Sequence, residues 1–183
     1  MKTPASSQGH DVLLPTASGH HIPDLLASQL KLVFCGTAPS RASAAAKAYY
    51  AKPGNKFWPS LHTVGITPRR FAPHEYPMLL ALGIGLTDLC KDHSGTDAEL
   101  PRGAFDAIAF ERKLKKFRPA IVAFTSKNAA QGYFGCAVRY GWQGAGQAGE
   151  PALARFFVLP SPSGLATRFF DIEIWRELSD SLV

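Results

Sequence analysis

Leu32-Val33-Phe34-Cys35 is a short apolar run that stops at Gly36, and two similar runs follow it, Ala120-Ile121-Val122-Ala123-Phe124 and Arg155-Phe156-Phe157-Val158-Leu159. Each run is too short for a helix and is closed by a breaker or a polar turn, which is typical of a buried strand. Strands that are apolar throughout and alternate with helices predict a parallel sheet covered on both faces. We therefore expect an α/β fold, a three-layer αβα sandwich around a central, mostly parallel sheet of four to five strands.

The segments between these runs have helical patterns. Ser40 is suited to cap a helix over residues 42–50, which are rich in alanine, and Pro53-Gly54 ends that helix. Residues 83–89 are punctuated by glycine and predict a short strand and turn, whereas residues 141–149 are glycine-rich without a period. Further helices are expected over residues 57–64, 73–82, 104–117, 126–134 and 169–182.

Length and composition indicate one ordinary folded domain. The 183 residues are 46% hydrophobic and carry a net charge of +6, which suits a polyanionic partner without requiring one. We expect residues 1–23 to form an N-terminal arm and residues 24–183 to form the domain. The longest apolar stretch, residues 78–86, is far shorter than the roughly 20 residues that span a bilayer. The N-terminus lacks the apolar core of a secretory signal, so the chain is expected in the cytoplasm and not in a membrane.

The three cysteines, Cys35, Cys90 and Cys136, are widely separated and odd in number. This pattern argues against a disulfide framework. It also cannot supply the four thiolates of a conventional iron–sulfur cluster. We therefore expect free thiols and neither a metal nor another cofactor.

Two loops follow the first and third apolar runs, at the sheet edge where ligands bind in open parallel sheets. The Gly36 loop is residues 36–40, Gly-Thr-Ala-Pro-Ser, and the Ser161 loop is residues 160–165, Pro-Ser-Pro-Ser-Gly-Leu. Neither has the spacing of a dinucleotide or P-loop fingerprint. Either one alone could be an ordinary turn. Together they mark the edge where a binding site is expected.

These loops, with the block Tyr50-Ala51-Lys52-Pro53-Gly54-Asn55-Lys56-Phe57-Trp58 between them, resemble the ordered motifs of the uracil-DNA glycosylase superfamily. The resemblance runs from about Leu32 to the C-terminus and is closest to the mismatch-specific uracil/thymine branch. It implies a monofunctional glycosylase of base excision repair. Such a hydrolase flips uracil out of DNA and hydrolyses its N-glycosidic bond, leaving an abasic site. It further implies a monomer without cofactor that acts on double- and single-stranded DNA containing uracil.

The resemblance assigns five residues to the base pocket. Tyr50 matches the aromatic side chain on which the base stacks, an interaction worth roughly 1–3 kcal/mol per base. Its alternative role is core packing. Gly36, Thr37 and Ala38 match the pocket wall, whose backbone amides can donate to a uracil carbonyl. Asn128 can read a base edge through its amide, or it can cap the helix that follows.

The water-positioning group departs from the family pattern. The third position of the Gly36 loop is Ala38, where the mismatch branch has Asn and the best-known branch has Asp, and a methyl group cannot orient a water. Asn55 is the first substitute, because a related branch that acts on hypoxanthine uses the equivalent Asn. Its alternative role is a helix cap. Asp88 is the second substitute and the stronger base, although a strand-end aspartate is often structural.

The Ser161 loop departs as well. Ser161 stands where the best-known branch has His and the mismatch branch Asn, so a hydroxyl replaces a stronger donor to the departing base. Ser163 and Gly164 are expected to contact DNA. Leu165 matches the wedge that enters the base stack, with core packing as its alternative role. Arg168 is placed to meet a phosphate or the orphaned base.

Three other functions remain open from the sequence. The same fold could act on hypoxanthine or on mismatched thymine, which Ala38 and Asn55 make credible. Loss of the polar side chain at Ala38 also fits a catalytically inactive DNA-binding relative. If the motifs are accidental, the chain is an unrelated α/β enzyme acting on a small molecule.

Overall fold

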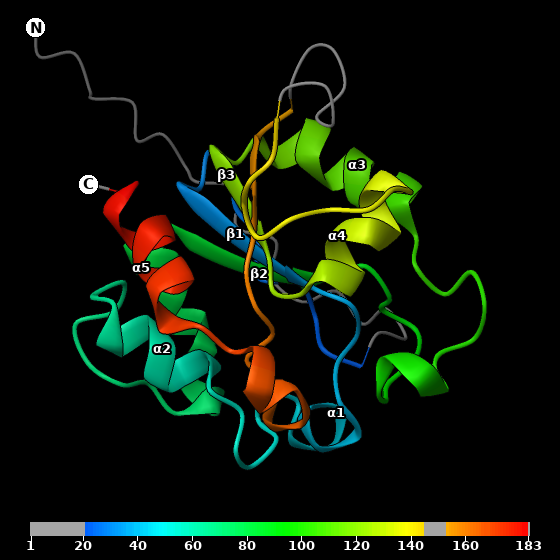
Figure 1. Cartoon of the computed structure of the whole chain (residues 1–183), viewed down its shortest axis with the longest axis horizontal. Helices are drawn as coiled ribbons and strands as arrows, with labels where there is room; N and C mark the ends of the chain where they lie inside the picture. The colour runs from blue at the N-terminus through cyan, green and yellow to red at the C-terminus, as the bar shows by residue number, and fades with distance from the viewer. Residues whose placement is uncertain (1–20, 145–152, 183) are drawn as a thin grey trace, which may run out of the picture.

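The computed structural model describes residues 21–144 and 153–182, and a five-stranded sheet forms the centre of these described parts (Figure 1). The strand order is β2-β1-β3-β5-β4. Four strands are parallel and β4 pairs antiparallel with β5. The expected mostly parallel sheet is confirmed. The strands are β1 Leu32–Gly36, β2 Ile84–Asp88, β3 Ile121–Phe124, β4 Gly141–Trp142 and β5 Arg155–Val158.

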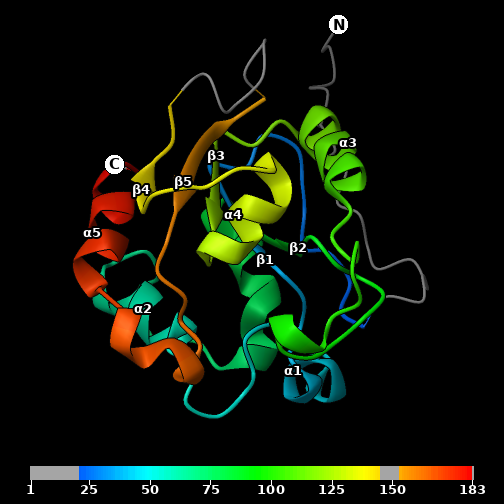
Figure 2. The same cartoon turned by 45° about the vertical axis from the view of Figure 1, so that its right-hand side comes forward.

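Helices cover both faces of the sheet. Figures 1 and 2 place α3 and α4 on one side of it and α2 and α5 on the other. This arrangement is the expected three-layer sandwich. The α-helices are α1 Arg41–Ala46, α2 Phe57–Thr63, α3 Ala107–Phe117, α4 Lys127–Phe134 and α5 Ile172–Asp180. The 3₁₀ helices are η1 Pro73–Leu82, η2 Asp97–Glu99 and η4 Gly164–Phe169.

Alternate strand residues face the two helical layers. Phe34 of β1 packs against Phe57 of α2 and Trp175 of α5, with ring centroids 5.1 and 6.1 Å apart. Phe124 of β3 packs on the opposite face against Phe110 of α3, 5.9 Å away. Burying each such ring contributes about 1.5–3 kcal/mol. Both faces of the sheet are therefore core, which explains why the strands are continuous apolar runs.

Several helix boundaries differ from those expected. The helix expected over residues 42–50 ends at Ala46, because Lys47 takes a left-handed conformation with φ 50°. The expected helix over 104–117 begins at Ala107, since the side chain of Asp106 caps it. Asp171 similarly caps α5, so that helix begins at Ile172. The expected helix over 73–82 is a 3₁₀ helix with Pro77 inside it.

The N-terminal described segment completes the sheet edge. Leu25 exchanges two backbone hydrogen bonds of 2.9 Å with Leu86, which covers the open side of β2. Ile22 is fully buried in the core. The core therefore begins two residues before the boundary expected from the sequence, while residues 1–20 of the expected arm lie outside the described residues. Within residues 21–144 and 153–182, no helix is long and apolar enough to cross a membrane.

Candidate active site

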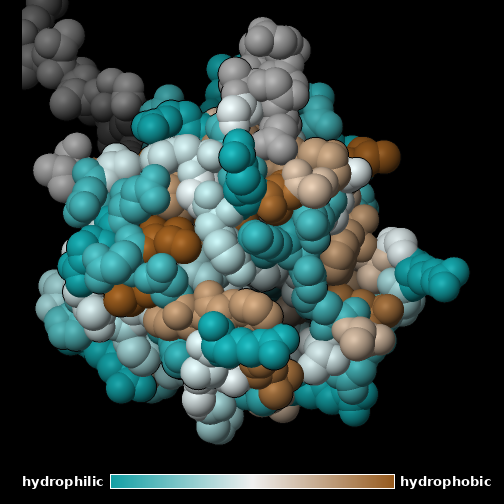
Figure 3. Space-filling view, viewed as in Figure 1, coloured by the Kyte–Doolittle hydropathy of each residue, from teal (hydrophilic) through white to brown (hydrophobic). Residues whose placement is uncertain are grey.

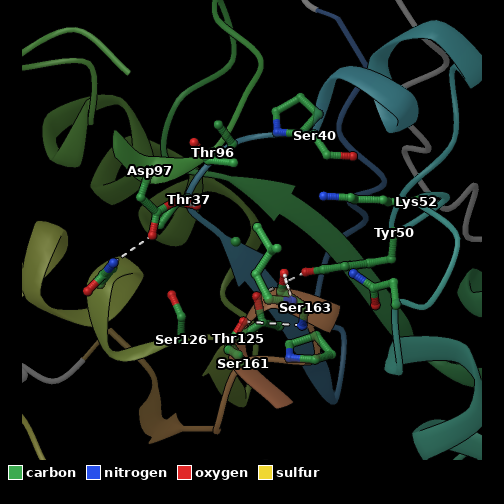
Figure 4. Close-up of a pocket in the computed structure, with 18 of the residues that line it drawn as sticks. Thr37, Ser40, Tyr50, Lys52, Thr96, Asp97, Thr125, Ser126, Ser161 and Ser163 are labelled. Carbon is green, nitrogen blue, oxygen red and sulfur yellow. Dashed lines mark hydrogen bonds between the residues drawn. The ribbon is translucent and has the colours of Figure 1, made fainter. Parts of the chain in front are cut away.

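A pocket of about 690 Å³ opens at the carboxyl ends of the parallel strands (Figure 4). Every site residue expected from the sequence lines it except Gly164 and Arg168. The lining residues among those expected are Gly36, Thr37, Ala38, Tyr50, Asn55, Asp88, Asn128, Ser161, Ser163 and Leu165. The pocket therefore joins side chains that are far apart in the sequence, because the strand ends gather their loops at one edge.

Tyr50 forms a fixed aromatic wall of this pocket. Its ring is stacked on Phe57, with centroids 3.8 Å apart and planes 15° apart, and its hydroxyl makes a 3.2 Å hydrogen bond with Thr125 Oγ1. Figure 4 shows the two hydroxyls pointing toward each other. The backbone of Tyr50 is left-handed, with φ 54°. Burial raises the pKa of Tyr50 well above its ordinary value. Core packing on one face and pocket lining thus coexist in this residue.

Gly36 is a glycine because polar groups crowd above it. A Cβ at this position would lie 2.5 Å from Asp88 Oδ1, 3.5 Å from the Tyr50 hydroxyl and 3.6 Å from Thr125 Oγ1. The first of these distances is far too short for a real contact. Gly36 and Asp88 are register partners at the ends of β1 and β2. The glycine therefore makes room for the carboxylate to reach the pocket floor.

Asp88 is a buried carboxyl group with little compensation. Its side chain lines the pocket, yet the residue is only 3% exposed, and Oδ2 has no hydrogen-bond partner in the described structure. Lys91 Nζ lies 3.7 Å from Oδ2, too far for a hydrogen bond but close enough for strong attraction. Burial raises the pKa of Asp88 to about 6, against the opposing effect of Lys91. A carboxylate with such a pKa is suited to accept a proton near neutral pH.

Asn55 has a partly committed amide. Its Oδ1 accepts a 2.9 Å hydrogen bond from the backbone N–H of Phe57, at the start of α2. This bond is a turn contact just before α2, whose N-cap position is Lys56, and it is a structural role of the kind considered from the sequence. It also fixes the orientation of an amide that lines the pocket, and the oxygen keeps a second lone pair for a water. Asn55 can therefore orient a water but cannot take its proton.

Asp97 bridges two expected pocket residues. Thr37 Oγ1 donates to Asp97 Oδ1 and Asn128 Nδ2 donates to Asp97 Oδ2, each over 2.6 Å. Figure 4 shows the labelled Thr37 and Asp97 close together. The sequence interpretation missed Asp97. The available local signal was the pair Thr96 and Glu99, which hydrogen-bond as a capping box and start η2.

Residues 23–179 match the family model of the uracil DNA glycosylase superfamily. The chain belongs to this superfamily. Membership assigns it to the DNA glycosylases, the hydrolases of DNA repair. A similar fold occurs in the solution NMR structure of a provisionally assigned uracil DNA glycosylase from Methanosarcina acetivorans. That match has a TM-score of 0.61 and 22% sequence identity, and it covers 88% of this chain and 96% of the other.

In this member of the superfamily, the Ser161 loop is tied to the turn before α2. The backbone N–H of Lys56 donates a 2.8 Å hydrogen bond to the carbonyl oxygen of Pro162. Inside the loop, the backbone N–H of Ser163 donates 3.3 Å to Ser161 Oγ, and that of Leu165 donates 3.3 Å to Ser163 Oγ. Both serine oxygens act as acceptors here, which leaves their O–H groups available as donors.

The rim of the pocket is apolar at η4, and basic side chains lie beside it. Leu165 is 73% exposed and Phe169 is 55% exposed, and both line the pocket. Leu165 is therefore not a core residue. The Arg168 guanidinium lies 4.5 Å from the centroid of the Phe169 ring, and Lys52 and Lys127 also line the pocket. Figure 3 shows apolar surface over η4 next to strongly hydrophilic side chains.

Proposed function

We propose that this protein is a monofunctional DNA glycosylase that hydrolyses the N-glycosidic bond of uracil and leaves an abasic site. One observation carries the proposal: the aromatic wall of Tyr50 and the buried carboxyl group of Asp88 line the same pocket. The partners are double- and single-stranded DNA, and the enzyme acts as a monomer. The positive net charge of +6 suits these partners.

The flipped base stacks on the face of Tyr50 that Phe57 leaves uncovered. Backbone amides of the Gly36 loop, which includes Thr37 and Ala38, donate to a carbonyl oxygen as the departing base becomes negative. The hydroxyl of Ser161 is a further donor at the pocket wall. These donors therefore bind the transition state, in which the departing base becomes negatively charged, more tightly than the intact substrate, and this difference in binding is what accelerates the reaction.

Hydrolysis needs a water molecule held close to C1′ of the deoxyribose. The bond between C1′ and the base nitrogen breaks, and its electron pair leaves with the base. The water oxygen bonds to C1′ and loses a proton. Asn55 Oδ1 orients this water and Asp88 accepts the proton, because an amide can orient a water but only the carboxylate can take up its proton. The negative charge of Asp88 also stabilises the positive charge on the sugar.

The rim holds the DNA. Leu165 enters the stack in place of the flipped nucleotide, since an exposed apolar side chain beside the pocket compensates the lost stacking. Ser163 and Gly164 contact the DNA backbone, and Arg168 meets a phosphate or the orphaned base.

Hypoxanthine and mismatched thymine are second candidate substrates. Ala38 leaves the Gly36 loop without the polar side chain that other branches carry, and the pocket of about 690 Å³ is larger than one pyrimidine. A larger base therefore has room in the same site.

A substrate panel tests the proposal. Duplexes with one uracil, hypoxanthine or mismatched thymine are incubated with the enzyme in the presence of a chelator, with and without alkali. We expect strand breaks at uracil after alkali and none before it, because the enzyme leaves an intact backbone. DNA binding without breaks on any duplex would identify an inactive DNA-binding relative. Faster cleavage at hypoxanthine would assign the second substrate.

A further inference from the structure

A cluster of charged side chains, of which Lys91 is buried and Asp24 and Lys113 are half-buried, lies behind the pocket floor, between the N-terminal segment, β2 and α3. Asp24 accepts hydrogen bonds from Thr87 Oγ1 over 2.7 Å and from Lys91 Nζ over 3.0 Å. Its other oxygen lies 2.6 Å from Lys113 Nζ. Two cations thus hold one anion. Burial opposes the charge of Asp24, yet Lys91 and Lys113 together hold its pKa below the ordinary value.

Lys91 connects this cluster to the pocket. Its side chain is only 7% exposed, and Nζ donates a 3.0 Å hydrogen bond to the Tyr49 hydroxyl besides its contact with Asp24. The same Nζ lies 3.7 Å from Asp88 Oδ2. A lysine buried to this degree costs several kcal/mol unless it is paired. Asp24 and the Tyr49 hydroxyl accept the hydrogen bonds of the Lys91 ammonium group, which also attracts the Asp88 carboxylate electrostatically.

We propose, on the basis of the proposed function, that Lys91 is a positioning residue for hydrolysis, held by Asp24 so that it keeps the Asp88 carboxylate anionic and aimed into the pocket. The step that depends on it is the transfer of a proton from the attacking water to Asp88, while the water oxygen bonds to C1′ and the base leaves with its electron pair. Lys91 touches neither water nor sugar in this scheme. It acts only through Asp88.

The charges around Asp88 make opposite predictions for two variants. Lys91 and Lys113 lower the pKa of Asp88, whereas Asp24 raises it. The remaining titratable neighbours, Cys35, Tyr49 and Tyr50, are neutral near pH 7, because burial raises the pKa of each well above its ordinary value. Removing Lys91 must therefore make Asp88 harder to ionise. Replacing Asp24 by Asn removes the negative charge but keeps an oxygen that can accept from Lys91, so it must make Asp88 easier to ionise.

The test is the pH profile of single-turnover uracil excision. We expect the wild-type rate to rise with pH around a midpoint near 6. Lys91→Met should move this midpoint up by about 1–3 pH units, the usual effect of an opposite charge at this distance. Asp24→Asn should move it down, and Lys91→Arg should keep the wild-type profile. Lys115→Met, which removes an exposed lysine paired with Glu111 on α3, is the matched control and should leave the midpoint in place.

General destabilisation cannot produce midpoints that move in opposite directions. If Lys91→Met and Asp24→Asn keep the wild-type midpoint, or move it in the same direction, the inference is wrong. NMR titration of the Asp88 carboxyl carbon in each folded variant, without DNA, reads the same displacements independently of turnover. A wild-type protein that fails to release uracil refutes the proposed function, whereas an active wild type with an unmoved Asp88 titration refutes only the role of Lys91.

Discussion

Replacing Asp88 by Asn should raise the stability of the protein relative to wild type as the pH rises from 4 to 8, while removing the proton acceptor. The change keeps the side-chain shape and deletes a charge that is buried without a hydrogen bond on Oδ2. A charge held in such an environment for function is a stability cost that the amide does not carry.

The magnitude follows from the position of the Asp88 titration. Burial raises the pKa of this group from 3.8 to about 6. Each unit of difference between folded and unfolded pKa corresponds to about 1.4 kcal/mol, so ionising Asp88 costs the folded state on the order of 3 kcal/mol. The folded pKa lies above the unfolded one, so the folded state binds the proton more tightly. The cost is therefore absent below about pH 4, grows between pH 4 and 6, and is complete above pH 7.

Thermal melting of wild type and Asp88→Asn at a series of pH values from 4 to 8 measures this dependence. At 2–4 °C per kcal/mol for a chain of this size, the Tm of the variant relative to wild type should rise by roughly 6–12 °C across the series. An unsatisfied N–H of the new amide would cost about 1–3 kcal/mol at every pH. This cost shifts the Tm difference by the same amount at each pH and leaves its rise with pH unchanged. Asp180→Asn, at the exposed end of α5, is the matched control. A Tm difference that stays constant or shrinks with rising pH would show that folding does not raise the pKa of Asp88.

Four further outcomes are expected from the same structure. Gly36→Ala should cost about 1–3 kcal/mol of stability and most of the activity, because its Cβ would lie 2.5 Å from a carboxylate oxygen. Its control is Gly144→Ala, whose Cβ would have open space around it and which should melt as wild type. Equal melting temperatures for both variants would contradict the close packing at Gly36. Tyr50→Ala should lower kcat/KM for uracil by roughly 5- to 150-fold, through loss of about 1–3 kcal/mol of stacking. Tyr50→Phe should retain most of the wild-type kcat/KM, because it keeps the ring. An equal loss of kcat/KM in both variants would argue against stacking. Leu165→Ala and Phe169→Ala should each slow excision from duplex DNA more than from single strands, since these exposed side chains fill the gap left in the base stack of a duplex. Equal losses of rate on both substrates would exclude the wedge role. DNA affinity in binding titrations should fall steeply with rising salt, and salt-independent binding would exclude phosphate neutralisation as its source.

The sheet could be predicted from the sequence because its strands are buried on both faces. Apart from the exposed Arg155, the run at Leu32 and the two later runs carry apolar side chains, and each contains a parallel strand. The end of α1 could not be predicted in this way. The alanine-rich pattern continues to residue 50, but Tyr49 is drawn into the core, where its carbonyl oxygen accepts a hydrogen bond from Trp58 Nε1. Tertiary packing there overrides helix propensity.

The site could be predicted as far as its motifs are local. The Gly36 and Ser161 loops line one pocket because they follow β1 and β5, two parallel strands separated only by β3, at the same end of the sheet. The long-range polar contacts at and behind the pocket could not be predicted, since Asp97 reaches Thr37 across 60 residues and Asp24 reaches Thr87 across 63. No local pattern encodes such pairs. The polar groups behind and beside the pocket therefore emerged only from the fold.

Direct detection of free uracil tests whether this protein cleaves the N-glycosidic bond and whether Asp88 takes part. Excess enzyme is mixed with a duplex that carries one uracil, in chelator, and both the released base and the remaining strand are weighed by mass spectrometry. We expect one uracil and one intact abasic strand per duplex for wild type, and a rate at least about 100-fold lower for Asp88→Asn, the usual minimum contribution of a general base. An unchanged strand bound to the wild-type protein, or an Asp88→Asn variant as fast as wild type, would contradict it.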